Sequence, residues 1–203
     1  MTRLFFVRHG RTVARQDQCI GHTDVALAPD GAEMIRTLVA DGLATKVTRI
    51  VSSDLCRAAE SAAILATTLG CAIEHDERLR EMSFGEWEGK LWSKIAHDDA
   101  KHFHAWTEGW IDVAPPGGES AAQLARRAAG WTTELLDAAE ADARIVIVSH
   151  AGWIRGALTH LLARDLAGLF DIPIDLGRAT VIDVSAKGCG VVAENLSRLD
   201  RHL

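Results

Sequence analysis

Basic residues follow three apolar runs of the chain. Arg8 and His9 come directly after "RLFFV", Arg57 follows "TRIVSS", and His150 ends "RIVIVSH". A guanidinium group matches the oxygens of a phosphate, and an imidazole can bind an anion, attack phosphorus or carry a proton. Two arginines and two histidines brought together would therefore form a site for a doubly charged oxyanion such as phosphate.

Each of these residues also has a purely structural interpretation. A lone histidine at a strand end is usually a structural residue, and an arginine in the first turn of a helix usually lies in solvent. The combination is harder to explain in this way, because a buried strand that ends in Arg8 and His9 must accommodate a cation. Gly10 follows directly, and we expect the backbone to approach a ligand closely there.

Catalysis would need a nucleophile and a proton donor in addition to a phosphate pocket. His9 is the candidate nucleophile, because a neutral imidazole whose other nitrogen is fixed by a backbone carbonyl can attack phosphorus and form a phosphohistidine. The candidate proton donor is Glu81 in "ERLREMSFGEWEG", since partial burial favours a proton-donating carboxyl group. Glu77, Glu86 and Glu88 lie nearby, and spacing alone does not select among the four.

The elements that position these residues alternate between strands and helices. Apolar and β-branched runs predict strands, and apolar residues at helical spacing predict helices. The predicted strands are 3–7, 48–53 and the run from 144. The predicted helices are 32–43, 55–70, 121–139 and 154–162. This alternation predicts an α/β fold, a three-layer sandwich with a mostly parallel central sheet and helices on both faces. Ligands of such sheets bind at the carboxyl ends of the strands.

Local signals mark the ends of several elements. Ser53 or Asp54 is placed to cap the helix at 55–70, which Gly70 closes, and Glu119 or Ser120 is placed to cap the helix at 121–139. The runs 179–186 and 190–195, which flank Lys187 and Gly188, predict a terminal β-hairpin.

Residues 84–120 differ in character from the rest of the chain. Four tryptophans accumulate there, Trp87, Trp92, Trp106 and Trp110, and "PPGGES" ends the segment. We expect a helical excursion over the carboxyl ends of the strands, within a single domain of residues 1–203. The tryptophans are interpreted as core or lid packing, with an aromatic wall over a nucleoside-like substrate as the alternative.

The stretch "HDDAKHFH" is dense in residue types that bind metals. Residues two apart do not share a helix face, and His97 and His104 are two turns apart, so these side chains do not converge on one ion. We therefore expect neither a metal site nor a cofactor.

The composition limits the partners of this 203-residue chain. The net charge is -6 and the chain has no block of basic residues, which argues against a nucleic-acid partner. No apolar run approaches the length of about 20 residues that a membrane span needs. The four cysteines form no CxxC pair and no charged segment with an apolar run begins the chain, so we expect a cytoplasmic protein with reduced thiols. The expected partner is a small phosphorylated metabolite. The sequence leaves the oligomeric state open and is compatible with a homodimer.

Five motifs occur in a characteristic order: "RHGRT", "SSDLCRAAESA", "LREMSFGEWEG", "PPGGES" and "VSHAGWIR". Together, over about residues 4–155, they resemble the histidine phosphatase superfamily, which has the phosphoglycerate mutase-like fold. The resemblance implies that His9 is the phosphorylated nucleophile and Glu81 the general acid. It makes Arg8, Arg57 and a protonated His150 the pocket for the phosphoryl group, and it implies no metal.

The resemblance also bears on substrate contacts and on the reaction. Gly21, His22 and Thr23 lie in a loop that approaches the substrate in relatives. Arg15 stands where many relatives have an asparagine of the phosphate pocket, so it either contacts the substrate or points into solvent.

The segment "MSFGEWEGKLWSKI" resembles the phosphatase branch, whereas phosphoglycerate mutases usually carry a tyrosine here and this chain has none. We expect a phosphatase of small phosphate monoesters, with α-ribazole 5'-phosphate as a candidate substrate. Mutase-type phosphoryl transfer and a non-catalytic module that binds a phospholigand are the alternatives.

Overall fold

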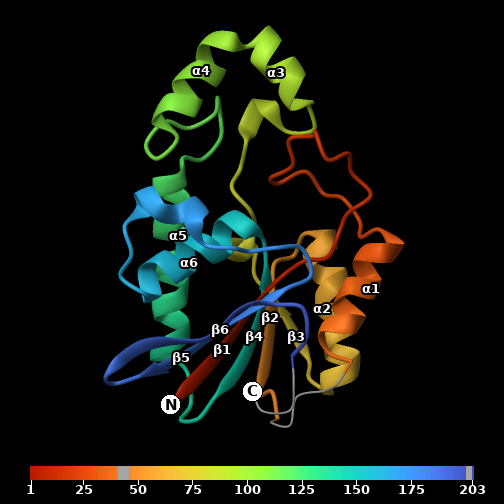
Figure 1. Cartoon of the computed structure of the whole chain (residues 1–203), viewed down its shortest axis with the longest axis vertical. Coiled ribbons are helices and arrows are strands. Elements are labelled where there is room, and N and C mark those ends of the chain that lie inside the picture. Colours follow the sequence, from red (N-terminus) through yellow and green to blue (C-terminus); the bar gives the residue numbers. More distant parts are fainter. Residues whose placement is uncertain (41–45, 200–202) are drawn as a thin grey trace.

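A central β-sheet organises the computed structural model, which describes residues 1–40, 46–199 and 203. Its strands follow the order β3-β2-β4-β1-β5-β6 across the sheet (Figure 1). They are β1 (Thr2–Arg8), β2 (Arg49–Ser52), β3 (Ile73–His75), β4 (Arg144–Ser149), β5 (Ala179–Ser185) and β6 (Gly188–Leu196). Strands β3, β2, β4 and β1 are parallel, and the terminal hairpin β5–β6 adds two antiparallel strands. The predicted mostly parallel sheet and the hairpin are confirmed.

Helices cover both faces of this sheet, with α5 and α6 on one side and α1 and α2 on the other (Figure 1). The helices are α1 (Pro29–Leu38), α2 (Cys56–Leu69), α3 (Trp92–Asp98), α4 (Ala100–Gly109), α5 (Ala121–Asp137) and α6 (Ala151–Leu161). Short 3₁₀ turns are η1 (Glu77–Leu79), η2 (Gly85–Trp87) and η3 (Leu166–Asp171).

Alternating side chains of the central strands divide the core into two layers. In β1, Leu4 and Phe6 pack with the α5–α6 side, while Phe5 and Val7 pack with the α1–α2 side. Successive residues of a strand point to opposite faces, so an unbroken apolar run is the pattern of a strand buried on both sides. The three-layer α/β fold is therefore confirmed.

Some element ends differ from the prediction. Helix α1 begins at Pro29, where a proline fits the first turn, and ends at Leu38; the predicted end at Leu43 lies outside the described residues. Strand β3 was not predicted, because it has three residues and two of them, Glu74 and His75, are exposed.

The cap of α2 was predicted wrongly. Neither Ser53 nor Asp54 caps this helix, whose N-cap residue is Leu55. The carboxylate of Asp24 accepts a hydrogen bond from Cys56 N at 2.7 Å, and Asp54 pairs with Arg80 instead. The predicted end at Gly70, with φ 65°, is confirmed, as is the capping of α5, where Ser120 forms a capping box with Gln123.

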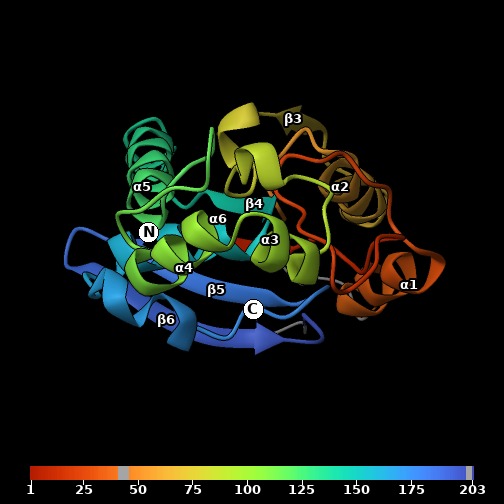
Figure 2. The same ribbon diagram turned by 90° about the horizontal axis from the view of Figure 1, so that it is seen from above.

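Residues 84–120 lie over the carboxyl ends of the strands, as expected (Figures 1 and 2). This excursion contains η2, α3 and α4, and α3 and α4 lie in front of the sheet when the molecule is viewed from above in Figure 2. Trp87 is buried there, and its Nε1 donates to Asp99 at 2.8 Å. Within residues 1–40 and 46–199, none of the helices combines the length and apolar character that crossing a bilayer requires.

Candidate active site

His9 lies at the carboxyl end of β1, in the loop that leaves the sheet. Its side chain is buried, and Nδ1 lies 2.7 Å from the carbonyl oxygen of Gly10. That contact assigns the proton to Nδ1 and leaves the lone pair of Nε2 free. Burial lowers the pKa of His9 to about 3, and the positive charge of Arg57 acts in the same direction. The imidazole is therefore neutral at pH 7, as a nucleophile must be.

Arg57 comes from the first turn of α2 and is almost fully buried, with 2% of its surface exposed. It donates to the carbonyl oxygens of Thr23 at 2.9 Å and Gly21 at 2.6 Å, and its Nε donates to His150 Nδ1 at 3.2 Å. Arg57 thus joins the loop around residues 21–23 to the end of β4.

His150 follows β4 and is the N-cap residue of α6. Its Nε2 lies 2.9 Å from Ser53 Oγ, and its ring centroid is 5.0 Å from that of His9. Burial lowers the pKa of His150 well below its usual value, and the charge of Arg57 adds to this effect. His150 is therefore neutral in the protein alone, because a buried imidazole beside a guanidinium loses its proton, and its protonation beside a bound phosphoryl group stays a prediction.

Arg8 is the last residue of β1, and its Nη1 donates to Ile174 O at 2.8 Å. Burial lowers the pKa of this arginine, and the negative charge of Glu81 opposes the effect. Its Nε is buried without a hydrogen-bond partner among the described residues. Because leaving a buried charged donor unpaired is costly, this nitrogen points to an anionic ligand.

Glu81 reaches the N-terminus of α6, directly after His150. Its carboxylate accepts hydrogen bonds from Gly152 N at 3.1 Å, Trp153 N at 3.2 Å and Met82 N at 3.0 Å. A Cβ atom on Gly152 would lie only 2.4 Å from Glu81 Oε1, so a larger residue at this position would displace the carboxylate from its place at the helix. The structure thus brings the predicted acid to the same sheet edge as His9.

The loop around Gly21, His22 and Thr23 is held by Glu88, a role that sequence reasoning missed. The carboxylate of Glu88 accepts from the backbone N–H groups of these three residues at 2.8–3.1 Å and from Phe84 N at 3.0 Å. Burial alone would raise the pKa of Glu88, but hydrogen bonds from the Thr23 hydroxyl and from these backbone N–H groups outweigh it and lower the pKa. Glu88 was one of four acids that spacing left open, and its partners in the loop around residues 21–23 lie more than 60 residues away in the sequence.

Two further expectations concern Gly10 and Arg15. A Cβ atom on Gly10 would lie 2.2 Å from the carbonyl oxygen of Gly31, so the close approach seen here is to the backbone of α1, and the approach to a ligand stays a prediction. The side chain of Arg15 is 68% exposed and pairs with Asp17 at 2.9 Å. Arg15 thus lies in solvent here, and the contact with a substrate stays a prediction.

A cavity of about 410 Å³ opens beside Glu81. Aromatic side chains form much of its wall: Phe84, Trp92, Trp106, Trp110 and Phe170. Trp92 and Trp106 are stacked at 5.7 Å, while Trp87 packs behind them. The tryptophans therefore provide both the packing and the aromatic wall that the sequence left as alternatives.

Arg155 adds a cation to this cavity and was not predicted as a site residue, although it ends the motif "VSHAGWIR". Its Nε donates to Ile172 O at 3.0 Å, and its guanidinium lies 5.6 Å from the centroid of the Phe170 ring. Burial lowers the pKa of Arg155, while the charge of Glu81 opposes the effect. The cavity can therefore hold an apolar body that carries a polar group.

The histidines of the 97–104 stretch pair separately with carboxylates. His97 contacts Asp98, His102 contacts Asp99, and His104 contacts Glu108. In the described part of the chain, no group of three or more histidine, cysteine, aspartate or glutamate side chains is arranged to hold a metal ion.

Comparisons with known proteins identify the family. Residues 4–197 match the model of the histidine phosphatase superfamily (branch 1). The adenosylcobalamin/alpha-ribazole phosphatase of Salmonella typhimurium is 29% identical over 90% of each chain. Among solved structures, the alpha-ribazole phosphatase of Shigella flexneri has a TM-score of 0.90 at 25% identity over 97% of this chain and 98% of that one. A mycobacterial glucosyl-3-phosphoglycerate phosphatase has a TM-score of 0.80 at 28% identity over 95% and 98%.

These findings agree with the resemblance carried by the five sequence motifs. The matched region contains all five motifs and every residue of the buried basic cluster, Arg8, His9, Arg57 and His150. The chain therefore belongs to branch 1 of the histidine phosphatase superfamily and is a phosphatase.

Proposed function

We propose that this chain hydrolyses a small phosphate monoester through a phosphohistidine on His9, within a single domain of residues 1–203. The observation that carries the proposal is the place of Glu81. Its carboxylate lies at the N-terminus of α6 beside the buried basic cluster and also lines the aromatic cavity. A bound ester would therefore place its phosphoryl group on the cluster and its leaving group in the cavity.

In the first step, Nε2 of His9 attacks phosphorus and a bond between these atoms forms while the ester P–O bond breaks. The N–H groups of Arg8 and Arg57 stabilise the charge of the transferring group, and His150 lies beside it. Glu81, in its protonated form, gives its proton to the leaving oxygen. Because Nδ1 donates to Gly10 O, the ring is already oriented for this attack.

In the second step, water replaces the alcohol. The carboxylate of Glu81 takes a proton from the water, whose oxygen attacks the phosphorus of the phosphohistidine. The P–N bond breaks, inorganic phosphate leaves and neutral His9 is restored. Glu81 is protonated again, so the two steps close a cycle.

The cavity supports a leaving group with a planar or apolar body. Trp92, Trp106 and Trp110 offer aromatic surface, and Arg155 offers a charged group near the phosphoryl site. α-Ribazole 5'-phosphate, which the names of the Salmonella and Shigella relatives suggest, carries an aromatic base and fits this description. We propose it as the first substrate to test, with Gly21, His22 and Thr23 near the phosphoryl group. Cytoplasmic location and a homodimer stay predictions.

The nucleophile can be tested with 4-nitrophenyl phosphate in the presence of a chelator. We expect turnover by the wild type and a loss of at least about 10³-fold in His9→Ala, since the covalent route is then closed. Acid-labile, base-stable phosphate should be trapped on the wild type and be absent from His9→Ala. His104→Ala, which changes an exposed histidine on α4, is the matched control.

Substrate choice requires a second measurement, a turnover screen over α-ribazole 5'-phosphate, phosphoglycerates, sugar phosphates and nucleotides. The proposal predicts the highest kcat/KM for an ester whose leaving alcohol carries an aromatic ring. Transfer of the phosphoryl group to a phosphoglycerate instead of water would favour the mutase alternative. Phosphate binding without chelator-resistant turnover of any ester would favour the binding module.

A further inference from the structure

Glu81 lies on a segment that has no regular secondary structure. Residues 80–84 belong to no helix or strand, so no regular hydrogen-bond ladder of the backbone fixes the place of this carboxylate. The polar backbone groups of such a segment need other partners, and those partners determine where Glu81 lies.

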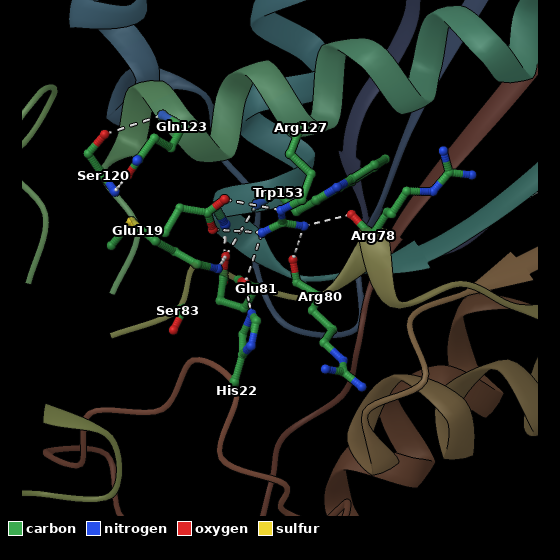
Figure 3. A network of polar contacts seen from close by, with 12 residues as sticks. His22, Arg78, Arg80, Glu81, Ser83, Glu119, Ser120, Gln123, Arg127 and Trp153 are labelled. Atoms are coloured by element: carbon green, nitrogen blue, oxygen red, sulfur yellow. Dashed lines mark hydrogen bonds and ion pairs between the residues drawn. The ribbon is translucent and has the colours of Figure 1, made fainter. Parts of the chain in front are cut away.

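Arg127 of α5 supplies many of these partners (Figure 3). Its Nη1 donates to Arg78 O at 2.6 Å and to Arg80 O at 2.9 Å, and its Nη2 donates to Glu81 O at 3.2 Å. Three carbonyl groups within four residues therefore converge on one guanidinium. This geometry fixes the backbone on both sides of the acid.

Glu119 orients the guanidinium from the other side (Figure 3). Its carboxylate accepts from Nε of Arg127 at 3.1 Å and from Nη2 at 2.8 Å. An arginine side chain has five N–H donors, and these five hydrogen bonds use all of them. Both Arg127 and Glu119 are largely buried, so water competes little for the contacts.

The same contacts link Glu81 to the excursion over the sheet. Glu119 lies at the end of residues 84–120, and its backbone N–H donates to Ser83 O at 2.8 Å. His22 adds a second hydrogen bond to the carbonyl oxygen of Glu81, at 2.9 Å from Nε2. The backbone end of Glu81 is thus held by Arg127 and His22, while α6 holds its carboxylate.

We propose that Arg127 is a positioning residue for proton transfer by Glu81. The hydrogen bonds and ion pairs of Arg127 go to Glu119 and to the carbonyls of Arg78, Arg80 and Glu81, so it acts through the segment that carries the acid. This inference rests on the proposed function, in which Glu81 protonates the leaving group. A shift of about 1 Å in a catalytic group can cost on the order of 100-fold in rate.

The test compares two esters in wild type and Arg127→Lys. Lysine keeps the positive charge, but its ammonium group lacks the planar, forked arrangement of N–H donors that reaches three carbonyl groups and a carboxylate at once. With an alkyl phosphate, whose leaving group needs a proton, we expect kcat/KM to fall on the order of 10- to 100-fold. With 4-nitrophenyl phosphate, whose leaving group needs little protonation, we expect a change of less than about threefold.

Matched variants make this result specific. Arg126→Lys changes the neighbouring exposed arginine of α5 and should leave both rates unchanged. In a Glu81→Gln background, Arg127→Lys should have no further effect on the alkyl ester, because the group that Arg127 positions no longer transfers a proton. Glu119→Gln retains the guanidinium but weakens its orientation, and should shift the same ratio in the same direction. It decides the question if Arg127→Lys does not fold.

Equal losses on the two esters in Arg127→Lys, or additive losses in the double variant, would overturn the proposal in favour of a structural role. The proposed function fails in a different way. If Glu81→Gln itself leaves the ratio between the two esters unchanged, Glu81 is not the proton donor and the inference falls with it. If Glu81→Gln shifts the ratio and both Arg127→Lys and Glu119→Gln do not, only the role of Arg127 is overturned.

Discussion

At the scale of single residues, the basic part of the site consists of cationic and neutral groups held away from water. His9 is neutral because burial and Arg57 lower its pKa to about 3, and Arg8 retains a buried N–H without a partner among the described residues. These features are unfavourable in the protein alone. In the proposed function, a bound phosphate dianion offsets both unfavourable features, so we expect the site to prefer a doubly charged ligand.

Gly152 has no side chain and so leaves room for the Glu81 carboxylate at the end of α6. Gly152→Ala tests whether catalysis needs the carboxylate at this place. Alanine normally stabilises a helix relative to glycine by up to about 1 kcal/mol. Here its Cβ would lie 2.4 Å from Glu81 Oε1, so the carboxylate must move. We expect kcat/KM for an alkyl phosphate to fall on the order of 10-fold or more, as steady-state kinetics would show.

The control for this substitution is Gly130→Ala in α5, where an added Cβ meets no atom within 4 Å. That variant should unfold at a slightly higher temperature and retain wild-type kinetics. Full activity of Gly152→Ala on the alkyl ester would mean that Glu81 does not need its place at the end of α6.

At the scale of elements, the proposed phosphate pocket depends on a loop that has no regular structure. The loop around Gly21 and Thr23 gives its carbonyl groups to Arg57 and its N–H groups to Glu88. One carboxylate and one guanidinium therefore satisfy opposite sides of the same backbone. This arrangement holds the Arg57 side chain through backbone carbonyl groups of the loop.

Glu88→Gln tests this loop. A neutral amide presents N–H groups to backbone donors, so some of them lose their acceptor, and we expect a loss of about 2 kcal/mol in the free energy of unfolding. Because Arg57 is held by the carbonyls of the loop, the Kd for inorganic phosphate should rise as well. Urea unfolding and calorimetry measure the two effects.

Glu86→Gln, which changes an exposed acid two residues away, is the matched control and should change neither quantity. A Glu88→Gln variant with wild-type stability and a wild-type Kd would contradict the role given to Glu88.

The sequence predicted those elements whose signal is local. The run before Arg8 could be predicted as a strand because continuous apolar residues suit a strand buried on both faces. Ser120 is an N-cap residue type and so indicated the start of α5. Strand β3 carries too few apolar residues to be found in this way. The cap of α2 comes from Asp24, 32 residues before Cys56, so no local pattern could show it.

The same distinction applies to the site. His9, Arg57 and His150 could be predicted because each follows a recognisable strand, and the resemblance selected Glu81 among four acids. Arg127 and Glu88 act through backbone groups that are distant in the sequence, and their spacing carries no sign of this.

At the scale of the whole molecule, an acidic chain with a net charge of -6 holds its cationic site by burial and not by a basic surface. Four strand-and-loop segments deliver the site to one sheet edge, and residues 84–120 cover that edge (Figure 1). The core packs around His9 and His150, which are both buried. The folded chain therefore keeps both histidines neutral, whereas in the unfolded chain both can take up protons.

This burial predicts a loss of stability in mild acid. With a pKa of about 3 in the folded chain and about 6.5 when unfolded, His9 binds more protons in the unfolded state between these values, so stability falls as the pH falls. From pH 8 to pH 5 this amounts to about 2 kcal/mol for His9, and His150 acts in the same direction. Urea unfolding of His9→Gln should show a pH dependence weaker by that amount, whereas His104→Gln should follow the wild type; parallel curves for all three proteins would contradict a neutral, buried His9.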